Sequence, residues 1–253
     1  MMNFIKTELM KEKRGTNLKL GMIVPIIFVL LNIAMVSLMG ESPKGKSYIM
    51  ATSFNWYPLL ILPIILSLLV LNISSKEKIE HIVFQKSMNV SFAKIELAKN
   101  IVILMELFTI LVVSSFLIFI FVTLFSGENI VLAQLVLATG CLFIGSLPII
   151  AVSFLIYGLV KKKAVLILLN FILSFPSPVI AITNNWILFP WSYSLRMLSP
   201  VVGVHPNGTF LDKSSELMNM KMTYLGLCLS IVVYVLILIL NLLIKSKRGE
   251  RNV

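Results

Sequence analysis

The segment GESPKGKS, at residues 40–47, matches G-x-x-x-x-G-K-[ST], the pattern of a loop that binds nucleotide phosphates. In that chemistry Gly40 and Gly45 let the backbone approach the phosphates, Lys46 binds them, and Ser47 holds magnesium. Such a loop needs a strand before it and a helix after it, so that backbone N–H groups converge on the phosphates. A long apolar run precedes Gly40 instead, and no amphipathic helix pattern begins at Ser47. We therefore expect a polar turn that binds no nucleotide.

The composition is that of a membrane protein. Of the 253 residues, 58% are hydrophobic and 13% are charged, and the mean hydropathy is +0.97. A soluble domain is nearer half apolar and a quarter charged. The net charge of +11 arises from basic residues beside apolar runs, where anionic lipid and membrane topology explain it better than nucleic acid does.

Six apolar segments are long enough to cross a bilayer core of roughly 30 Å. They cover residues 18–39, 54–73, 101–125, 130–158, 163–182 and 222–244. The first is too long for the apolar region of a signal peptide, so we expect it to be a transmembrane helix. The predicted fold is an all-α polytopic membrane protein, with residues 1–253 forming a single transmembrane domain.

The basic residues predict the orientation, because cytoplasmic loops are enriched in Lys and Arg. Most of the 22 Lys and Arg residues fall on one side of the predicted spans: Lys6, Lys11, Lys13, Arg14, Lys19, Lys76, Lys78, Lys86, Lys94, Lys99, Lys161, Lys162, Lys163, Lys245, Lys247, Arg248 and Arg251. We expect a multi-pass protein of the cell membrane with both termini in the cytoplasm. GESPKGKS then lies outside the cell, where ATP is absent.

Residues that could do chemistry are few. The single aspartate, Asp212, lies in a polar outer loop, so no apolar strand ends in Asp to hold magnesium. His81 and His205 fall on opposite sides of the predicted membrane. Cys141 and Cys228 lie in apolar runs and are expected to be packing residues. Without an H-E-x-x-H or G-x-S-x-G pattern, we expect no catalytic residue, no metal and no cofactor on this chain.

The N-terminal segment, residues 2–14, places Met2, Ile5 and Leu9 at helical spacing among Lys and Glu. This pattern is typical of a helix that lies in the membrane interface. A plain basic tail that only directs topology fits the pattern equally well.

The segment 74–100 is predicted to be a helical cytoplasmic loop. Ser74 and Glu77 form an S-x-x-E capping box, and Ile79, Ile82 and Val83 line one face of the helix that would follow. An exposed apolar helix face could dock into a groove of a partner protein. The alternative is a helix that rests on lipid.

Glu106 is the one ionisable residue that lies clearly at bilayer depth, in the third span. Such a residue is a functional hypothesis by default. It could recognise a cationic substrate, bind a proton, reach the cytoplasmic surface or pair with a lysine. A lone acidic group argues against a proton-coupled carrier. On the last span Gly226 and Ser230 form a small-xxx-small packing face.

The segment 183–221 is predicted to lie outside the cell, before the last span. Its first half is apolar and aromatic, with Trp186, Phe189, Trp191 and Tyr193. Because prolines interrupt it and aromatic rings favour the headgroup level, we expect a re-entrant or interfacial element near the outer leaflet. Its second half carries turn signals and is expected to be a polar loop.

This layout resembles that of an ABC type-2 transporter permease over essentially the whole chain. FNWYPLLILPIILSLLVLN at 54–72, SMNVSFAKIELAKNIVI at 87–103 and FPWSYSLRMLSP at 189–200 look like segments of lantibiotic-immunity permeases of Gram-positive bacteria. Exporters of amphipathic staphylococcal-type toxin peptides are similar too.

The resemblance implies a permease subunit that has no nucleotide site and is not itself an enzyme. ATP and magnesium would bind to a separate ATP-binding cassette subunit, present in two copies, and a second permease, identical or homologous, would complete the conduit. The substrate would be an amphipathic cationic peptide, expelled from the bilayer. The coupling helix would fall on Lys76–Asn89, with Glu77, Ile79, Ile82, Val83 and Phe84 contacting the ATPase. The candidates for substrate or interface contacts are Glu106, Trp191, Gly226 and Ser230.

Two other classes of function remain open at this point. One is a membrane-bound immunity or receptor protein that binds its peptide without transporting it. The other is an intramembrane enzyme, which the missing catalytic constellation disfavours. A neighbouring gene that encodes an ATPase would favour the transporter.

Overall fold

The fold is helical throughout the part of the chain that the structure describes. This computed structural model describes residues 1–13, 15–40, 42–43, 45–76, 85, 87, 90–128 and 130–251. Within these ranges the only β-type pairing is an isolated bridge between Val204 and Phe210. The expected all-α class is confirmed.

The α-helices are α1 (Met2–Glu12), α2 (Thr16–Ser37), α3 (Tyr48–Trp56), α4 (Leu62–Ser74), α6 (Phe92–Phe121), α7 (Leu132–Val160), α8 (Lys163–Ser174), α9 (Ser177–Ala181), α10 (Tyr193–Val202) and α11 (Met220–Arg251). A π-helical stretch, Tyr57–Ile61, joins α3 to α4, and another, Val122–Ser126, extends α6. Short 3₁₀ helices cover Asn184–Leu188, Pro190–Ser192 and Glu216–Met218.

Within the described ranges, five helices are long and apolar enough to cross a membrane. They are Thr16–Ser37, Tyr48–Ser74, Phe92–Ser126, Leu132–Val160 and Met220–Lys245. The chain is therefore a multi-pass membrane protein. Helix α6 begins well before the predicted third span, because residues 92–100 of the expected cytoplasmic loop continue directly into it.

The remaining expected span, 163–182, is not one continuous helix. Helix α8 has 12 residues, or about 18 Å at 1.5 Å per residue, which is short of the roughly 30 Å bilayer core. Pro176 follows it and has no N–H to continue the hydrogen-bond ladder. The hydroxyl of Ser177 donates instead to the carbonyl of Ser174, and the short helix α9 begins. Apolar length alone did not reveal this break.

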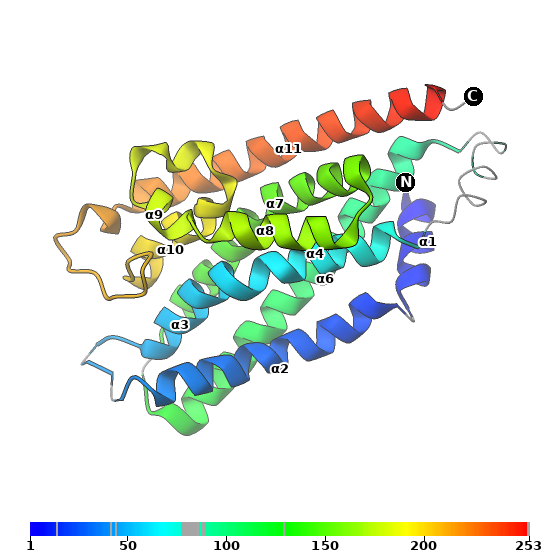
Figure 1. Cartoon of the computed structure of the whole chain (residues 1–253). Coiled ribbons are helices and arrows are strands. Elements are labelled where there is room, and N and C mark those ends of the chain that lie inside the picture. Colours follow the sequence, from blue (N-terminus) through cyan, green and yellow to red (C-terminus); the bar gives the residue numbers. More distant parts are fainter. Residues whose placement is uncertain are drawn as a thin grey trace.

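The long helices run side by side, and both termini lie at the same end of the bundle (Figure 1). Helix α1 crosses the others at this end. We call this end the terminal end. Helices α9 and α10 and the start of α11 lie at the opposite end, which we call the far end.

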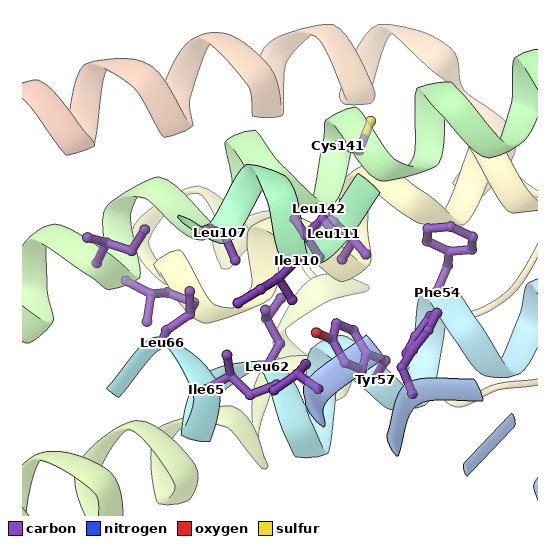
Figure 2. Close-up of a cluster of buried hydrophobic side chains, with 14 of the residues drawn as sticks. Phe54, Tyr57, Leu62, Ile65, Leu66, Leu107, Ile110, Leu111, Cys141 and Leu142 are labelled. Carbon is purple, nitrogen blue, oxygen red and sulfur yellow. The ribbon is translucent and has the colours of Figure 1, made fainter. Parts of the chain in front are cut away.

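The core lies where α3, α4, α6 and α7 meet. Figure 2 shows its aromatic and aliphatic side chains, which include Phe54, Tyr57, Leu62, Ile65, Leu66, Leu107, Ile110, Leu111, Cys141 and Leu142. The ring of Phe28 from α2 packs edge-on against Tyr57 with centroids 4.4 Å apart. Cys141 is buried as expected, but Cys228 is exposed on α11. In a membrane helix both lipid-facing and core-facing positions are apolar, so the pattern could not separate them.

Helix α10 is buried between α7 and α11, and two glycines make room for it. A Cβ added at Gly145 of α7 would lie 2.5 Å from Oγ of Ser194 and 2.8 Å from Cε of Met197. A Cβ added at Gly226 of α11 would lie 2.8 Å from Sδ of Met197. Gly226, predicted to lie on a helix-packing face, therefore packs against α10 of its own chain.

Hydrogen bonds from both neighbouring helices hold α10 in place. The hydroxyl of Thr223 on α11 donates to the carbonyl of Met197 at 3.0 Å, and the amide of Gln134 on α7 donates to the carbonyl of Val201 at 2.8 Å. Ser230, one turn beyond Gly226, is buried and donates to the Gly226 carbonyl at 2.7 Å. The far end is thus closed by a helix anchored on two sides.

Replacing Gly145 with alanine should loosen this contact and lower the stability of the protein. The methyl group would overlap Ser194, and overpacking of this kind typically costs about 1–3 kcal/mol. The matched control is Gly140→Ala on the same helix, where nothing lies within 4 Å of the added Cβ. Thermal unfolding in detergent should show a lower midpoint for G145A and an equal or higher midpoint for G140A. Equal midpoints for the two variants would contradict this packing.

Candidate functional site at the terminal end

The candidate site is built around Asn17 at the terminal end. This buried side chain donates from Nδ2 to Oε2 of Glu106 at 2.7 Å and to the carbonyl of Leu69 at 3.3 Å. Its own Oδ1 accepts a hydrogen bond from Nδ2 of Asn72 at 2.8 Å. One amide therefore connects α2, α4 and α6, using both of its donor hydrogens and its acceptor. We call Asn17, Asn72 and Glu106 the Asn17 cluster.

An ion pair next to the Asn17 cluster joins α1 to the end of α4. Nζ of Lys76 lies 2.6 Å from Oε1 of Glu12 and donates to the carbonyl of Lys11 at 3.1 Å. Glu12 is buried, so its carboxylate depends on this cation. Gly15 makes the contact possible, because an added Cβ would lie 2.6 Å from Oε2 of Glu12 and would also meet Nζ of Lys76.

A cavity opens between α1, α2 and α6 beside these contacts. Its volume is about 550 Å³. The residues that line it are Lys6, Leu9, Met10, Glu12, Lys13, Asn17, Leu18, Gly21, Met22, Met105, Glu106 and Thr109. Most of the wall is apolar, and the charged groups come from α1 and from Glu106. An apolar cavity with a few placed polar groups is the usual form of a small-molecule site.

A second polar contact ties α6 to the last helix at the same end. The Lys245 ammonium forms an ion pair with Glu96, and Asn241 donates to Oε1 of Glu96 at 3.5 Å. Lys245 also lies 5.8 Å from the ring centroid of Phe154 on α7. Glu96 is buried, and this cluster holds α6, α7 and α11 together where they leave the apolar region.

Several predicted site residues lie outside the described residues. They are Glu77, Ile79, Ile82, Val83 and Phe84, the expected coupling face, together with most of Lys76–Asn89. The structure does place Lys76 in the ion pair with Glu12. Ser74, expected to cap a new helix, is the last residue of α4.

The other predicted site residues are spread over the molecule. Glu106 belongs to the Asn17 cluster at the terminal end, whereas Trp191, Gly226 and Ser230 lie around α10 at the far end. The Trp191 ring packs against Phe189 with centroids 5.4 Å apart. The structure therefore does not bring Glu106 together with the other three residues.

The described part of GESPKGKS is a helix-capping loop. Helix α2 precedes it, as expected, and Ser47 is the N-cap of α3, a largely buried helix without the amphipathic pattern of a helix that follows a phosphate loop. Its hydroxyl accepts from the Met50 N–H at 3.0 Å and donates to Glu128 at 2.5 Å. Nζ of Lys46 lies 4.9 Å from the ring centroid of Phe210. The lysine and serine of the motif are thus engaged in contacts within the chain.

Arg196 lies within α10 and is 9% exposed. Its Nε and Nη1 atoms have no hydrogen-bond partner among the described residues. Burial lowers the pKa of its guanidinium, and the nearby Glu216 carboxylate opposes this shift. Among the described residues, no three His, Cys, Asp or Glu side chains are placed to hold a metal ion.

Asn17 and Asn72 were not singled out from the sequence, and Lys76 was named only as a cytoplasmic basic residue and as the start of the predicted coupling helix. The available signal in the sequence was a polar residue at the edge of each apolar run. The structure shows that these residues face each other from neighbouring helices. That signal is weak, because asparagine and lysine commonly end a transmembrane segment. No protein-family model, curated protein or solved structure matches this chain.

The pair of Glu12 and Lys76 should contribute more to stability than a pair within one helix. In a double-mutant cycle with Glu12→Gln and Lys76→Gln, we expect a coupling free energy of about 1 kcal/mol, because the pair links two helices and Lys76 also donates to the carbonyl of Lys11. The reference pair is Glu8 and Lys11, 2.5 Å apart, whose carboxylate is equally buried but which lies within α1 alone, and pairs within one helix typically give about 0.2–0.5 kcal/mol. Thermal unfolding of the single and double variants measures both values. A coupling for Glu12 and Lys76 no larger than the reference would contradict the bridging role.

Proposed function

We propose that this chain is the permease subunit of an ATP-driven ABC exporter that expels amphipathic antimicrobial or toxin peptides from the membrane. The observation that carries the proposal is the ion pair of Lys76 with Glu12. It joins the N-terminal helix to the first residue of the predicted coupling segment. A partner that moved this segment would therefore pull on α1.

The direction in which each helix runs supports six crossings. Helix α7 ends at the terminal end, and α11 begins at the far end (Figure 1). The chain returns between them through α8, the short α9 and the 3₁₀ turns. In this proposal α8 and α9 form the fifth crossing, and α10 is the re-entrant element before the last one. Both termini then face the cytoplasm.

Energy would enter through a partner. Two copies of an ATP-binding cassette subunit would hold ATP and magnesium, and a second permease, identical or homologous, would complete the conduit. Closure of the ATPase pair would move the segment after Lys76, and the Asn17 cluster would transmit that motion to α2 and α6. The apolar wall of the cavity beside α1 suits an amphipathic cargo.

The coupling face can be tested by placing charge on it. The double change Ile82→Asp and Val83→Asp should lower co-elution of the neighbouring-gene ATPase, and peptide protection of cells, by about tenfold or more, because carboxylates would enter an apolar contact. His81→Asp is the control, since helical spacing places it away from this face. Unchanged co-elution and protection in the double variant would overturn the proposed docking. ATPase-independent protection would favour a receptor that binds its peptide without transport.

The proposed topology is testable with single cysteines in a variant that lacks Cys141 and Cys228. Cysteine at the exposed position of Lys46, at the far end, should react with an impermeant maleimide in intact cells. Cysteine at the exposed position of Lys162, at the terminal end, should react only after lysis. The reverse labelling pattern would place the termini outside the cell.

A further inference from the structure

The cavity between α1, α2 and α6 presents three kinds of surface to one ligand. Lys6, Glu12 and the C-cap residue Lys13 border it from α1, with Glu12 paired to Lys76. Glu106 borders it from α6, and Leu18 and Met22 contribute apolar wall from α2. The two lysines are exposed and seven residues apart, so they lie on the same side of α1, two turns from each other. The basic, acidic and apolar surfaces together match an amphiphile that carries one negative and one positive group.

Glu106 forms no ion pair within the described residues. Its partner is the neutral amide of Asn17 at 2.7 Å, and Lys76, the nearby ammonium, forms its ion pair with Glu12 instead. A carboxylate beside apolar side chains is costly unless a positive charge reaches it. A ligand ammonium in the cavity would supply that charge and donate hydrogen bonds to the free carboxylate lone pairs.

The lysines exclude a ligand that is only cationic. Lys6 and Lys13 form no ion pair with an acidic side chain among the described residues, so they favour a phosphate at the same cavity. An anionic lipid without an amine would satisfy the lysines but leave Glu106 unmatched. A zwitterion that has a phosphate beside a primary ammonium satisfies both.

The apolar wall supplies the third requirement. Leu18, Met22 and Met105 continue along α2 and α6 from the charged border of the cavity, and all three side chains are exposed. Flexible Met side chains adapt to irregular apolar ligands such as acyl chains. The volume of about 550 Å³ lies within the range of ordinary ligand sites.

We propose that this cavity binds the headgroup of phosphatidylethanolamine. The ammonium lies on Glu106, the phosphate on Lys6 and Lys13, and the acyl chains along Met22 and Met105. Bound lipid completes the contact between α1 and the bundle. The proposal requires only that the chain is a membrane protein and does not depend on peptide export.

Native mass spectrometry of the purified full-length chain tests the proposal. The probes are phosphatidylethanolamine, phosphatidylcholine and phosphatidylglycerol with identical acyl chains. Phosphatidylethanolamine should be retained most strongly, because the quaternary ammonium of phosphatidylcholine cannot donate hydrogen bonds to Glu106. Glu106→Gln should lower retention of phosphatidylethanolamine about tenfold and that of phosphatidylcholine by less, because phosphatidylcholine loses only the charge attraction. Replacing Lys6 and Lys13 with Gln should weaken retention of all three lipids.

The matched control is Glu128→Gln, a carboxylate bonded to Ser47 and remote from the cavity, which should change no lipid retention. Equal retention of phosphatidylethanolamine and phosphatidylcholine by the unaltered chain would overturn the proposal, and this comparison needs no variant to fold. A Glu106-dependent preference for a synthetic Lys- and Leu-rich peptide, with no preference among lipids, would overturn it too and assign the cavity to a peptide.

Discussion

A polar side chain inside an apolar bundle must find its hydrogen-bond partner within the protein, and this constraint sets how the helices meet. Asn17 joins α2, α4 and α6 through three hydrogen bonds. Asn170 of α8 does the same elsewhere, donating to Ser67 of α4 at 2.7 Å and to Ser153 of α7 at 2.8 Å. Hydrophobic attraction between helices is weak against lipid, so these polar contacts determine which faces pack together.

Different contacts hold the helices together at the two ends of the bundle. At the terminal end, the ion pairs of Glu12 with Lys76 and of Glu96 with Lys245 hold the outermost segments. At the far end, α10 is seated through close backbone approach at Gly145 and through hydrogen bonds from its neighbours. Separating either pair would leave a buried carboxylate without its cation, and opening the far end would undo the packing of α10.

The nucleotide-like motif illustrates how position changes the chemistry of a sequence pattern. A phosphate loop needs free backbone N–H groups and an available lysine and serine. Here Ser47 caps α3 and binds Glu128, while Lys46 lies over Phe210. A helix does follow the motif, but a helix rather than a strand precedes it. The Ser47 hydroxyl and the Lys46 ammonium, which would bind a nucleotide in a phosphate loop, contact other groups of this chain instead.

Apolar composition was enough to predict an all-α membrane protein and its five long apolar helices. It was not enough for the interruption at Pro176 or for α10. Prolines occur inside continuous helices of this chain as well, at Pro25 and Pro148. Whether a proline ends a helix depends on what neighbouring segments offer to the freed carbonyl groups.

The amino-acid sequence by itself determined that the chain is an all-α membrane protein and where its five long apolar helices lie, because apolar composition is a local property. Only the tertiary structure decided that Asn17 contacts Glu106, that Lys76 neutralises Glu12 and that α10 fits between Gly145 and Gly226. Each of these contacts joins residues from different helices. Their formation depends on how each helix is rotated about its axis and how deep it lies in the bundle. The sequence does not specify either, because side chains that face lipid and side chains that face protein are both apolar.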